Sequence, residues 1–412
     1  MSPAPRLSRR SFLVVAAGGV VAVTLPSCVG GSSKDAPAAA SDTTAQTGGA
    51  ASAPRALVLV ELDGGNDGLS ALVPADGRYR DARPTIAVPE GDIVALSGTT
   101  EVGLHPALAP LAPLWADGRL AAVRGIGFPD PNRSHFVSLD RWWRADRTGA
   151  APGWLAPWLD SLADDAGQLA GTSIGGRAPQ LAGAHRLPTT LIEPASFTFE
   201  PRPMGDGLRA MSAPASADDL VAAAQAAMAR SVEAVADVAG LTTSAGVGAG
   251  DPGQGQPFTT GLALAAEIVA AATGPTVVVV SASGFDTHAG QEATHQRLYA
   301  DLAAGIAGYL QRADSAGFAD RSLLVTTSEF GRRVAENGSG GTDHGAANTC
   351  FVAGSAVVPG LHGAVDLGNL LDGDVRPTVD PRTLYTACLD WLGADVEAAL
   401  GRRYDEVQLL RT

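Results

Sequence analysis

The chain has 412 residues, of which 45% are hydrophobic and 17% charged, and a formal net charge of −14 at pH 7. An acidic surface repels nucleic acid and anionic membranes, so neither is expected as a partner. Cys28, Cys350 and Cys388 are too few for a disulfide framework, and the last two lie in apolar runs where buried free thiols are expected.

Residues 1–27 are predicted to be an export signal. Residues 8–13 (SRRSFL) carry paired arginines, and the apolar residues 12–25 are too few for a permanent membrane span. The sequence LPSC at residues 25–28 resembles a bacterial lipobox except for its proline, so Cys28 either carries a lipid or follows an ordinary cleavage site. We expect the twin-arginine translocase as the export partner and a periplasmic, extracellular or lipid-anchored location, with membrane contact only through that lipid.

Residues 28–54 contain almost no bulky apolar side chain and are predicted to be a disordered linker. Residues 55–412 are predicted to form a single α/β domain, a mostly parallel sheet with helices on both faces, because β-branched apolar runs alternate with Ala- and Leu-rich helical patterns. The expected strands are residues 56–62, 120–124, 276–281 and 322–327, and the expected helices are residues 217–239, 259–272, 291–316 and 382–400.

Charged residues directly follow two of the expected strands. Asp286 and His288 follow the strand at residues 276–281, and residues two apart in an extended chain point the same way, so both can grip one cation. The alternative is a turn carboxylate and a surface histidine. Glu329 follows the strand at residues 322–327 and is either a metal ligand or an acid at the start of a helical turn. Ligands of open α/β sheets bind beyond the carboxyl ends of the strands, which favours a shared site.

His344 lies in the Gly-rich sequence NGSGGTDHGAAN, whose backbone can pass close to a ligand. The adjacent Asp343 either orients the imidazole ring or serves the turn. Arg332 and Arg333 are candidates for holding an oxyanion, because a guanidinium matches phosphate geometry, and one of them is expected to be a structural ion-pair partner.

Asp63 ends the first expected strand in the sequence LVELDGGND, where a metal-binding carboxylate is expected. Asn66 and Asp67 are rival candidates, and the alternative is that these residues serve only the tight glycine turn.

Ser134 lies in the sequence PNRSHF, between Arg133 and His135. It is either a nucleophile activated by a base or a metal, or the N-cap of a helix that begins near Phe136.

The paired-arginine leader and the segments VLVELDGGNDGLSALVP, GLHPALAPLAPLWADGRLAAVRG, NRSHF, GFDTH and TTSEFGRRVAENGSGGTDHG together resemble the domain-of-unknown-function family 1501. That family is similar to the alkaline phosphatase and sulfatase superfamily. The resemblance covers nearly all of residues 55–412 and implies an alkaline-phosphatase-like three-layer α/β sandwich with a divalent metal. It implies Ser134 as the nucleophile, and as metal ligands Asp63, Asp286, His288, Glu329 and His344.

Three features depart from the superfamily pattern. Asp286 and His288 are separated by one residue, where the superfamily has three. The superfamily also has an Asp-His dipeptide where this chain has Glu329 and Phe330, so Phe330 replaces the histidine. The sulfatase signature of Cys or Ser followed by Pro and Arg is absent after Ser134.

Two functions follow as hypotheses. The first is an exported metal-dependent hydrolase of a phosphate-type or sulfate ester, acting on a small molecule or an envelope component. Its predicted catalytic residues are Ser134, Arg133, His135 and Arg332, and its ion is Zn²⁺ or Mn²⁺, with Mg²⁺ or Ca²⁺ as further options. The second is a non-catalytic cell-envelope binding protein that kept the fold with a degenerate site.

Overall fold

The computed structural model describes residues 12–16, 19–23, 54–146, 151–163, 166–194, 202–212, 219–246 and 257–411. Within the predicted leader, β1 (Phe12–Ala16) and β2 (Gly19–Val23) pair as antiparallel strands. The paired arginines, Cys28 and nearly all of the predicted linker lie outside the described residues. Among the described helices, none has the length and apolar character that crossing a bilayer requires.

An eight-stranded sheet forms the centre of the molecule, in the order β13-β7-β12-β11-β3-β10-β8-β9. β12 is antiparallel to both of its neighbours, and the other pairs are parallel. All four expected strands are present, which confirms the mostly parallel sheet. The strands are β3 (Ala56–Asp63), β7 (Leu120–Ile126), β8 (Gly171–Ile174), β9 (Thr189–Leu191), β10 (Thr276–Ser283), β11 (Ser322–Thr327), β12 (Asn348–Ala353) and β13 (Gly360–His362).

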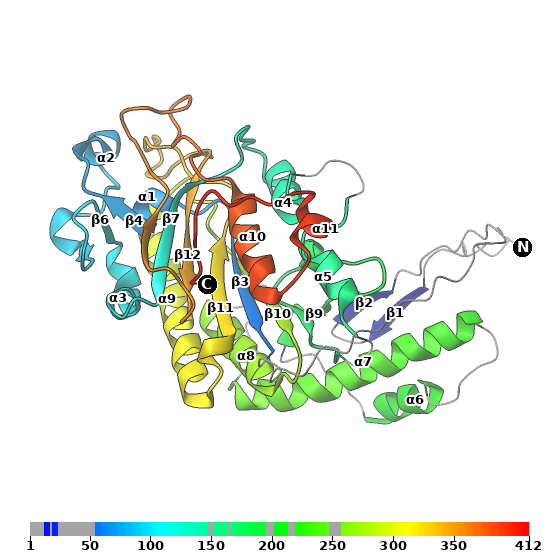
Figure 1. Cartoon of the computed structure of the whole chain (residues 1–412). Coiled ribbons are helices and arrows are strands. Elements are labelled where there is room, and N and C mark those ends of the chain that lie inside the picture. Colours follow the sequence, from blue (N-terminus) through cyan, green and yellow to red (C-terminus); the bar gives the residue numbers. More distant parts are fainter. Residues whose placement is uncertain are drawn as a thin grey trace, which may run out of the picture.

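Helices cover both faces of this sheet, so the predicted arrangement in three layers is confirmed (Figure 1). Val58 and Val60 of β3 join the core beneath α7 (Asp219–Ser244), α8 (Phe258–Ala271) and α9 (Gln291–Ala316). The alternate residues Leu57 and Leu59 join the core on the other face, because successive side chains of a strand point to opposite sides. The helices on that face are α4 (His135–Arg144), α5 (Ala156–Ser161), α10 (Pro381–Leu392) and α11 (Val396–Leu400).

The helix expected over residues 382–400 is in fact two helices. Gly393, with φ 68°, ends α10 in the left-handed conformation that favours glycine, and Asp395 caps α11 through the amide of Ala398. The prediction of one continuous helix was therefore wrong at this point.

A small three-stranded sheet lies beside the central one in the order β4-β6-β5. Its strands are β4 (Leu72–Pro74), β5 (Val94–Ala95) and β6 (Val102–Leu104). The remaining helices are α1 (Gly68–Ala71), α2 (Gly77–Ala82), α3 (Ala112–Ala116) and α6 (Arg202–Ser212), with the 3-10 helices η1 (Glu90–Asp92), η2 (Pro106–Leu111), η3 (Pro179–Leu181) and η5 (Ala319–Arg321).

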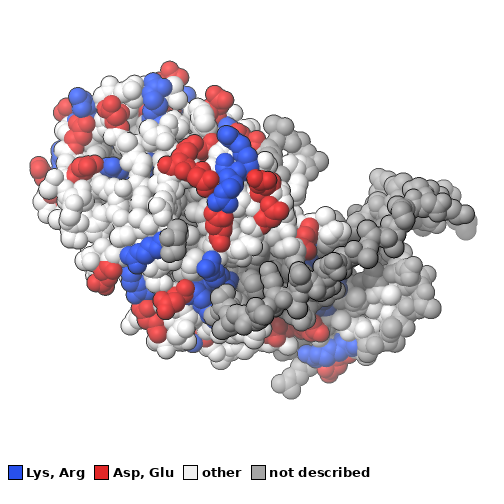
Figure 2. All heavy atoms as spheres, in the orientation of Figure 1, with Lys and Arg blue, Asp and Glu red and all other residues white. Residues whose placement is uncertain are grey.

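The order of the three central strands places the candidate site. β3 pairs in parallel with β11 on one side and β10 on the other, with Asp63 opposite Ser283 and Glu61 opposite Thr327. The loops that follow the three strands therefore meet at one edge of the sheet. Acidic and basic side chains are intermixed over the described part of the face in Figure 2, so the negative net charge is not gathered into one patch there.

Candidate metal centre

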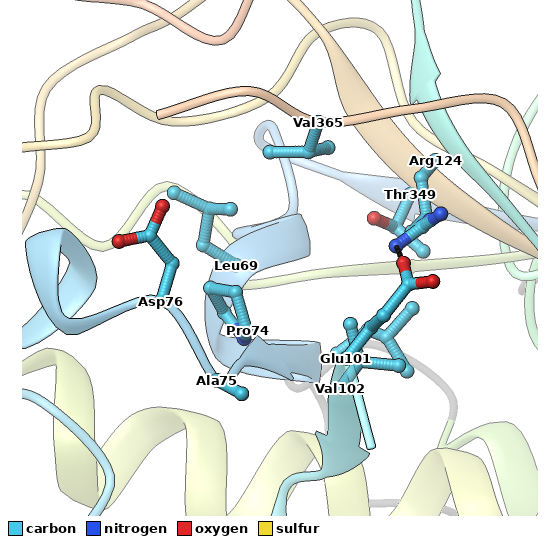
Figure 3. A pocket seen from close by; sticks show the side chains of 10 residues that line it. Leu69, Pro74, Ala75, Asp76, Glu101, Val102, Arg124, Thr349 and Val365 are labelled. Atoms are coloured by element: carbon cyan, nitrogen blue, oxygen red, sulfur yellow. Dashed lines mark hydrogen bonds and ion pairs between the residues drawn. The ribbon is translucent and has the colours of Figure 1, made fainter. Parts of the chain in front are cut away.

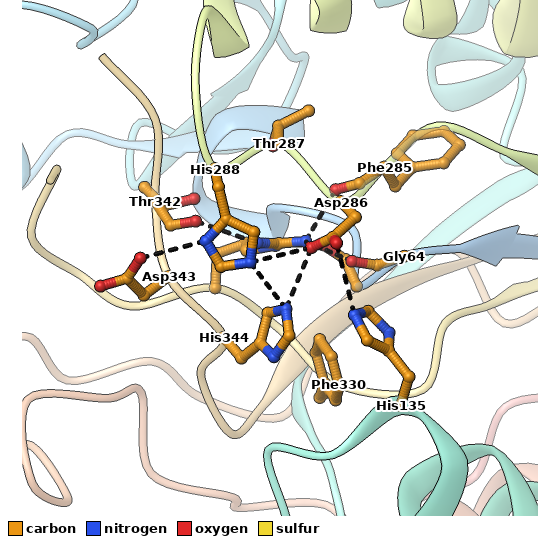
Figure 4. A network of polar contacts seen from close by, with 12 residues as sticks. Gly64, His135, Phe285, Asp286, Thr287, His288, Phe330, Thr342, Asp343 and His344 are labelled. Carbon is orange, nitrogen blue, oxygen red and sulfur yellow. Dashed lines mark hydrogen bonds and ion pairs between the residues drawn. The ribbon is translucent and has the colours of Figure 1, made fainter. Parts of the chain in front are cut away.

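Side chains from three separate segments converge at this edge of the sheet (Figure 4). Asp286 and His288 lie in the loop from β10 to α9, His344 lies in the loop from β11 to β12, and His135 is the first residue of α4. The ligand atoms of His135, Asp286 and His344 all lie within 4.8 Å of one another. The structure therefore brings together Asp286, His288 and His344 from the predicted ligand set and adds His135, which was predicted as catalytic.

Each of the three imidazole rings directs its Nδ1 atom at an oxygen that accepts hydrogen bonds. A neutral ring that donates from Nδ1 leaves the lone pair of Nε2 available. This second contact is the usual means by which proteins fix a histidine ligand. The pairs are His135 Nδ1 with Glu329 Oε1 at 2.8 Å, His288 Nδ1 with Asp343 Oδ1 at 3.1 Å, and His344 Nδ1 with the Arg133 carbonyl at 2.8 Å.

The three Nε2 atoms all point at the carboxylate of Asp286. His288 Nε2 and His344 Nε2 are 2.9 Å apart and lie 3.1 Å and 3.0 Å from Asp286 Oδ1. His135 Nε2 lies 3.5 Å from Asp286 Oδ2. One proton can satisfy one of these pairs, whereas a divalent cation satisfies every lone pair at once, so this set of donors fits a metal ion.

Asp286 is held in its ionised form. Burial alone would raise its pKa, but hydrogen bonds from Arg332 and His344 and the Arg332 charge outweigh burial and lower the pKa to about 2. The cluster therefore contains a carboxylate anion at neutral pH. The pKa of His135 is raised, chiefly by its hydrogen bond to Glu329, despite partial burial.

Arg332 is a buried residue that contacts the three loops of the site. It is 1% exposed, and its guanidinium donates to the carbonyls of Gly65 at 2.7 Å and Thr342 at 2.9 Å and to Asp286 at 2.7 Å. It also donates to the carbonyls of Gly64 and Phe285. These bonds hold the three loops together, which fits the expected alternative of a structural ion-pair partner, and the oxyanion role of Arg332 stays a prediction.

Glu329 is 4% exposed and supports the cluster from behind. Its Oε1 accepts from His135 Nδ1 at 2.8 Å and from the Gly64 amide at 2.9 Å, and its Oε2 accepts from the Ser328 hydroxyl at 3.1 Å. The alternative role at the start of a helical turn is wrong, because residues 328–347, between β11 and β12, contain no helix. Its carboxylate orients His135 in this structure.

Asp63 stands apart from the convergent group. Burial, followed by the charges of Glu61 and Glu329, raises its pKa to about 8. Within the described part of the chain its carboxylate forms no hydrogen bond or ion pair. Metal binding by Asp63 stays a prediction from the family resemblance.

The rival candidates Asn66 and Asp67 are structural. Asn66 is 1% exposed and accepts from the Tyr299 hydroxyl at 2.8 Å. Asp67 is fully buried, caps α1, and forms an ion pair with the buried Arg83 at 2.6 Å. Burial of Asp67 by itself raises its pKa, but the Arg83 charge and hydrogen bond lower it to about 2.

Phe330 forms an apolar wall beside the histidines. Its ring centroid lies 4.9 Å from that of His135 and 4.6 Å from that of His344. On its other side it packs on Gly65, where an added Cβ would lie 2.2 Å from the ring. Phe330 thus fills the space between the β3 loop and the cluster, a role that sequence reasoning missed because the residue was considered only as a missing ligand.

Ser134 lies on the segment that borders the cluster. It is the N-cap of α4, but its exposed hydroxyl makes no cap hydrogen bond. Its neighbours on both sides contact the cluster, since the Arg133 carbonyl accepts from His344 and His135 faces Asp286. Arg133 itself is 42% exposed, and its Nε and Nη2 donate to the buried Asp374 at 3.0 Å and 2.5 Å.

A cavity of about 380 Å³ lies elsewhere, between the small sheet and the loop that carries Val365 (Figure 3). Arg124 and Glu101, which form an ion pair of 3.0 Å, line it together with apolar residues that include Leu69 and Val102. None of the four converging residues, His135, Asp286, His288 and His344 (the metal cluster), lines this cavity.

Comparison with known proteins agrees with the resemblance predicted from the motifs. The model of a family described as "Protein of unknown function (DUF1501)" matches residues 207–408, the stretch that contains GFDTH and SEFGRRVAENGSGGTDHG, so the predicted resemblance is confirmed there. No curated protein matches the chain.

Solved structures that resemble the chain include members of the alkaline phosphatase superfamily. The phosphonate monoester hydrolase of Silicibacter pomeroyi is 10% identical, with a TM-score of 0.38 over 86% of this chain and 78% of that one. The alkaline phosphatase of the Antarctic bacterium TAB5 is 11% identical, with a TM-score of 0.37 over 83% and 99%. The lipoteichoic acid synthase LtaP of Listeria monocytogenes is 8% identical, with a TM-score of 0.37 over 83% and 72%. Likeness at this level transfers no residue role to this chain.

Proposed function

We propose that the protein is an exported metal-dependent hydrolase of a phosphate-type ester. In this proposal Asp286, His288 and His344 bind one divalent cation, and His135 is a fourth ligand. The observation that carries this proposal is the convergence of three imidazole Nε2 atoms on one ionised carboxylate. When both rings donate from Nδ1, the Nε2 lone pairs of His288 and His344 face each other at 2.9 Å, and a bound cation would relieve this unfavourable contact.

The donor set also favours particular ions. Imidazole nitrogen suits Zn²⁺, whereas Mg²⁺, Ca²⁺ and Mn²⁺ suit oxygen ligands, of which Asp286 is the only one in the cluster. We therefore propose Zn²⁺ first, with Mn²⁺ as the second ion that the sequence predicts. When bound, such an ion acts as a Lewis acid on a phosphoryl oxygen.

The start of α4 is suited to an anionic substrate. The amides of His135, Phe136 and Val137 begin a ten-residue helix and have no partner within it, and its dipole favours negative charge at this end. The Ser134 hydroxyl lies at the same place and is free of a cap bond. Attack by Ser134 Oγ on phosphorus forms a phosphoserine ester and releases the alcohol, and water then frees phosphate and restores the serine.

Phe330 supports a site with a single cation. Its ring packs against both His135 and His344 and occupies the space toward Gly65. The same observation favours the second candidate function, a non-catalytic envelope protein with a degenerate site, because an apolar ring stands where the superfamily pattern has a ligand.

Export through the twin-arginine pathway and the lipid at Cys28 remain part of the proposal.

The metal site is tested by elemental analysis of protein purified after native export. We expect near-stoichiometric metal in the wild type and almost none in the His288→Ala, His344→Ala double variant. A matched control removes two histidines outside the cluster, His185 and His362, and should keep its metal. Wild-type protein without metal, even after addition of Zn²⁺ and Mn²⁺, would favour the non-catalytic alternative.

Catalysis is tested with the metal-loaded protein on phosphate mono- and diesters. Ser134→Ala should lower kcat/KM on the order of 1,000-fold, about 4 kcal/mol of transition-state stabilisation, while leaving the metal content unchanged. Ser161→Ala, an exposed serine on α5, is the control and should have no effect. Full activity in Ser134→Ala would remove this residue from the mechanism.

A further inference from the structure

Gln291, the first residue of α9, lies behind the metal cluster and is 1% exposed. The preceding Gly290 has φ 55°, and this left-handed turn starts the helix directly after the loop that carries Asp286 and His288. Gln291 is therefore a buried amide at the meeting point of the loops that follow β3, β10 and β11.

The two ends of the amide bind different loops. Oε1 accepts from Thr287 Oγ1 at 3.0 Å and from Thr342 Oγ1 at 2.6 Å, and Nε2 donates to Asp67 Oδ2 at 2.7 Å. Thr287 stands between Asp286 and His288 in the chain, and Thr342 stands two residues before His344. One side chain thus connects both segments that carry the predicted ligands to the loop after β3.

The direction of each hydrogen bond follows from the chemistry of the partners. Asp67 is ionised beside Arg83 and can only accept, so the amide must present its NH₂ group to Asp67 and its oxygen to the threonines. Both threonine hydroxyls then donate to Gln291 Oε1. Because the Thr287 proton is used in this way, His295 Nε2 donates to Thr287 Oγ1, at 3.3 Å. The amide offers an acceptor on one side and donors on the other, which an ionised carboxylate or a thioether does not.

Backbone contacts bring the same loops together. The Gln291 amide donates to the Gly340 carbonyl at 2.9 Å, and the Thr342 amide donates to the Thr287 carbonyl at 3.2 Å. An added Cβ at Gly341 would lie 2.4 Å from the His288 backbone, so the two loops touch at this point. Because they are this close, a shift of one loop relative to the other changes the His288–His344 separation directly.

We propose that Gln291 is a positioning residue that sets the spacing of His288 and His344 around the bound cation, by fixing Thr287 and Thr342 to the buried Asp67. This proposal rests on the proposed metal site. Residues that orient metal ligands typically change metal affinity by about 10- to 100-fold when they are replaced.

The test uses the full chain with Co²⁺ as the probe, because the visible absorption of bound Co²⁺ reports ligand geometry. Gln291→Met keeps the length of the side chain and removes all three hydrogen bonds, and Gln291→Glu keeps the acceptor but places a carboxylate against Asp67. Both should bind Co²⁺ about 10- to 100-fold more weakly, with an altered absorption spectrum at saturation. Thr342→Val should behave similarly, and Thr342→Ser, which keeps the hydroxyl, should restore wild-type affinity and spectrum.

Two control variants on α9 separate positioning from general stability. Gln296→Met changes an exposed glutamine and should be neutral. Tyr309→Phe removes a buried hydrogen bond of 2.5 Å to Ser322, at the opposite end of β11, and should lower the melting temperature without changing Co²⁺ binding. Wild-type affinity and spectrum in Gln291→Met, or an equal loss of affinity in Tyr309→Phe, would overturn the proposal.

A second measurement does not need the metal. In metal-free protein, hydrogen exchange at the Gln291 and Thr342 amides should be faster in Gln291→Met than in the wild type and unchanged in Gln296→Met. If wild-type protein binds no Co²⁺, the proposed function fails, and hydrogen exchange alone then decides the role of Gln291. Unchanged exchange in Gln291→Met would show that the amide does not hold the loops together.

Discussion

Two charged clusters lie close together behind the β3 loop, and their hydrogen bonding differs. Around Asp67 both carboxylate oxygens have donors: Arg83 donates to both of them, to Ser70 and to the carbonyls of Val334 and Arg333. Around Asp286, by contrast, several acceptors face one another, with the Nε2 atoms of His288 and His344 only 2.9 Å apart. The charges of the first cluster satisfy each other and stabilise the fold, whereas the close acceptors of the second fit the cation that we propose.

Exposure supports the same distinction. The side chains of Asp67 and Arg83 are fully buried, while those of Asp286 and His288 are 47% and 44% exposed. Ligands and solvent ions can reach the second cluster and not the first. The predictions below test this difference, from the largest expected effect to the smallest.

Breaking the buried pair should have the largest effect on stability. Arg83→Met leaves Asp67 without its counter-ion, and loss of one partner of a buried ion pair costs about 3–5 kcal/mol. The free energy of unfolding, measured by urea denaturation, should fall by this amount, while the folded protein should still bind Zn²⁺ at saturating concentration. A mild loss of stability together with loss of metal would show that the two clusters are one functional unit.

Metal should stabilise the wild type through the exposed cluster alone. At a free Zn²⁺ concentration 100 times the Kd, binding adds about 2.7 kcal/mol to the stability of the folded state. His344→Ala should lose this gain, and Arg83→Met should retain it. The measurement is the melting temperature with and without Zn²⁺, and a gain that persists in His344→Ala would place the ion elsewhere.

Replacing Asp63 tests whether its carboxylate, at the end of β3, is a further acceptor of the candidate cation site. Because its pKa is raised to about 8, the folded metal-free protein holds the proton more tightly than the unfolded chain does. Its contribution is therefore fully favourable below about pH 4 and is lost as pH rises through 8. Asp63→Asn should make the metal-free protein more stable than wild type by up to about 5 kcal/mol at pH 9, because each of the roughly four units between the two pKa values is worth about 1.4 kcal/mol, and should leave it equal at pH 4.

If Asp63 also binds the cation, as the family resemblance predicts, added metal should cancel the difference at pH 9. A wild type that remains less stable than Asp63→Asn in saturating metal would exclude Asp63 as a ligand.

Trp143→Phe should have the smallest effect. Its indole Nε1 donates to Glu61 Oε1 at 3.2 Å, but Glu61 keeps its bonds from Gln180 at 2.9 Å and Ser281 at 2.8 Å. Loss of one of three donors costs about 1 kcal/mol in urea unfolding. Burial raises the pKa of Glu61 to about 6, so the loss should be larger at pH 8, where Glu61 is ionised, than at pH 5.

Local patterns were sufficient to predict the sheet and part of the site. The β-branched run TVVVVS favours a strand covered on both faces, and Asp286 and His288 in the loop after it reach the edge where ligands bind. The break in the helix over residues 382–400 was also visible in principle, since Gly393 supplies the left-handed residue that ends α10.

The roles of Arg332 and His135 could not be predicted in the same way. A buried arginine needs acceptors, and those of Arg332 come from the loops after β3, β10 and β11, which are far apart in sequence. His135 reaches Asp286 because α4 packs through Trp142 on the sheet, with Trp142 and Trp154 each against Tyr385. No local pattern encodes the angle at which a helix meets a sheet.

The amino-acid sequence by itself therefore determined the strands, most helices and the residue types delivered to the strand ends, because these depend on neighbours within a few positions. Only the tertiary structure decided which charges satisfy one another and which remain open to an ion. That decision depends on distances of about 3 Å between loops, and these are set by the packing of the whole sheet and its two helical layers.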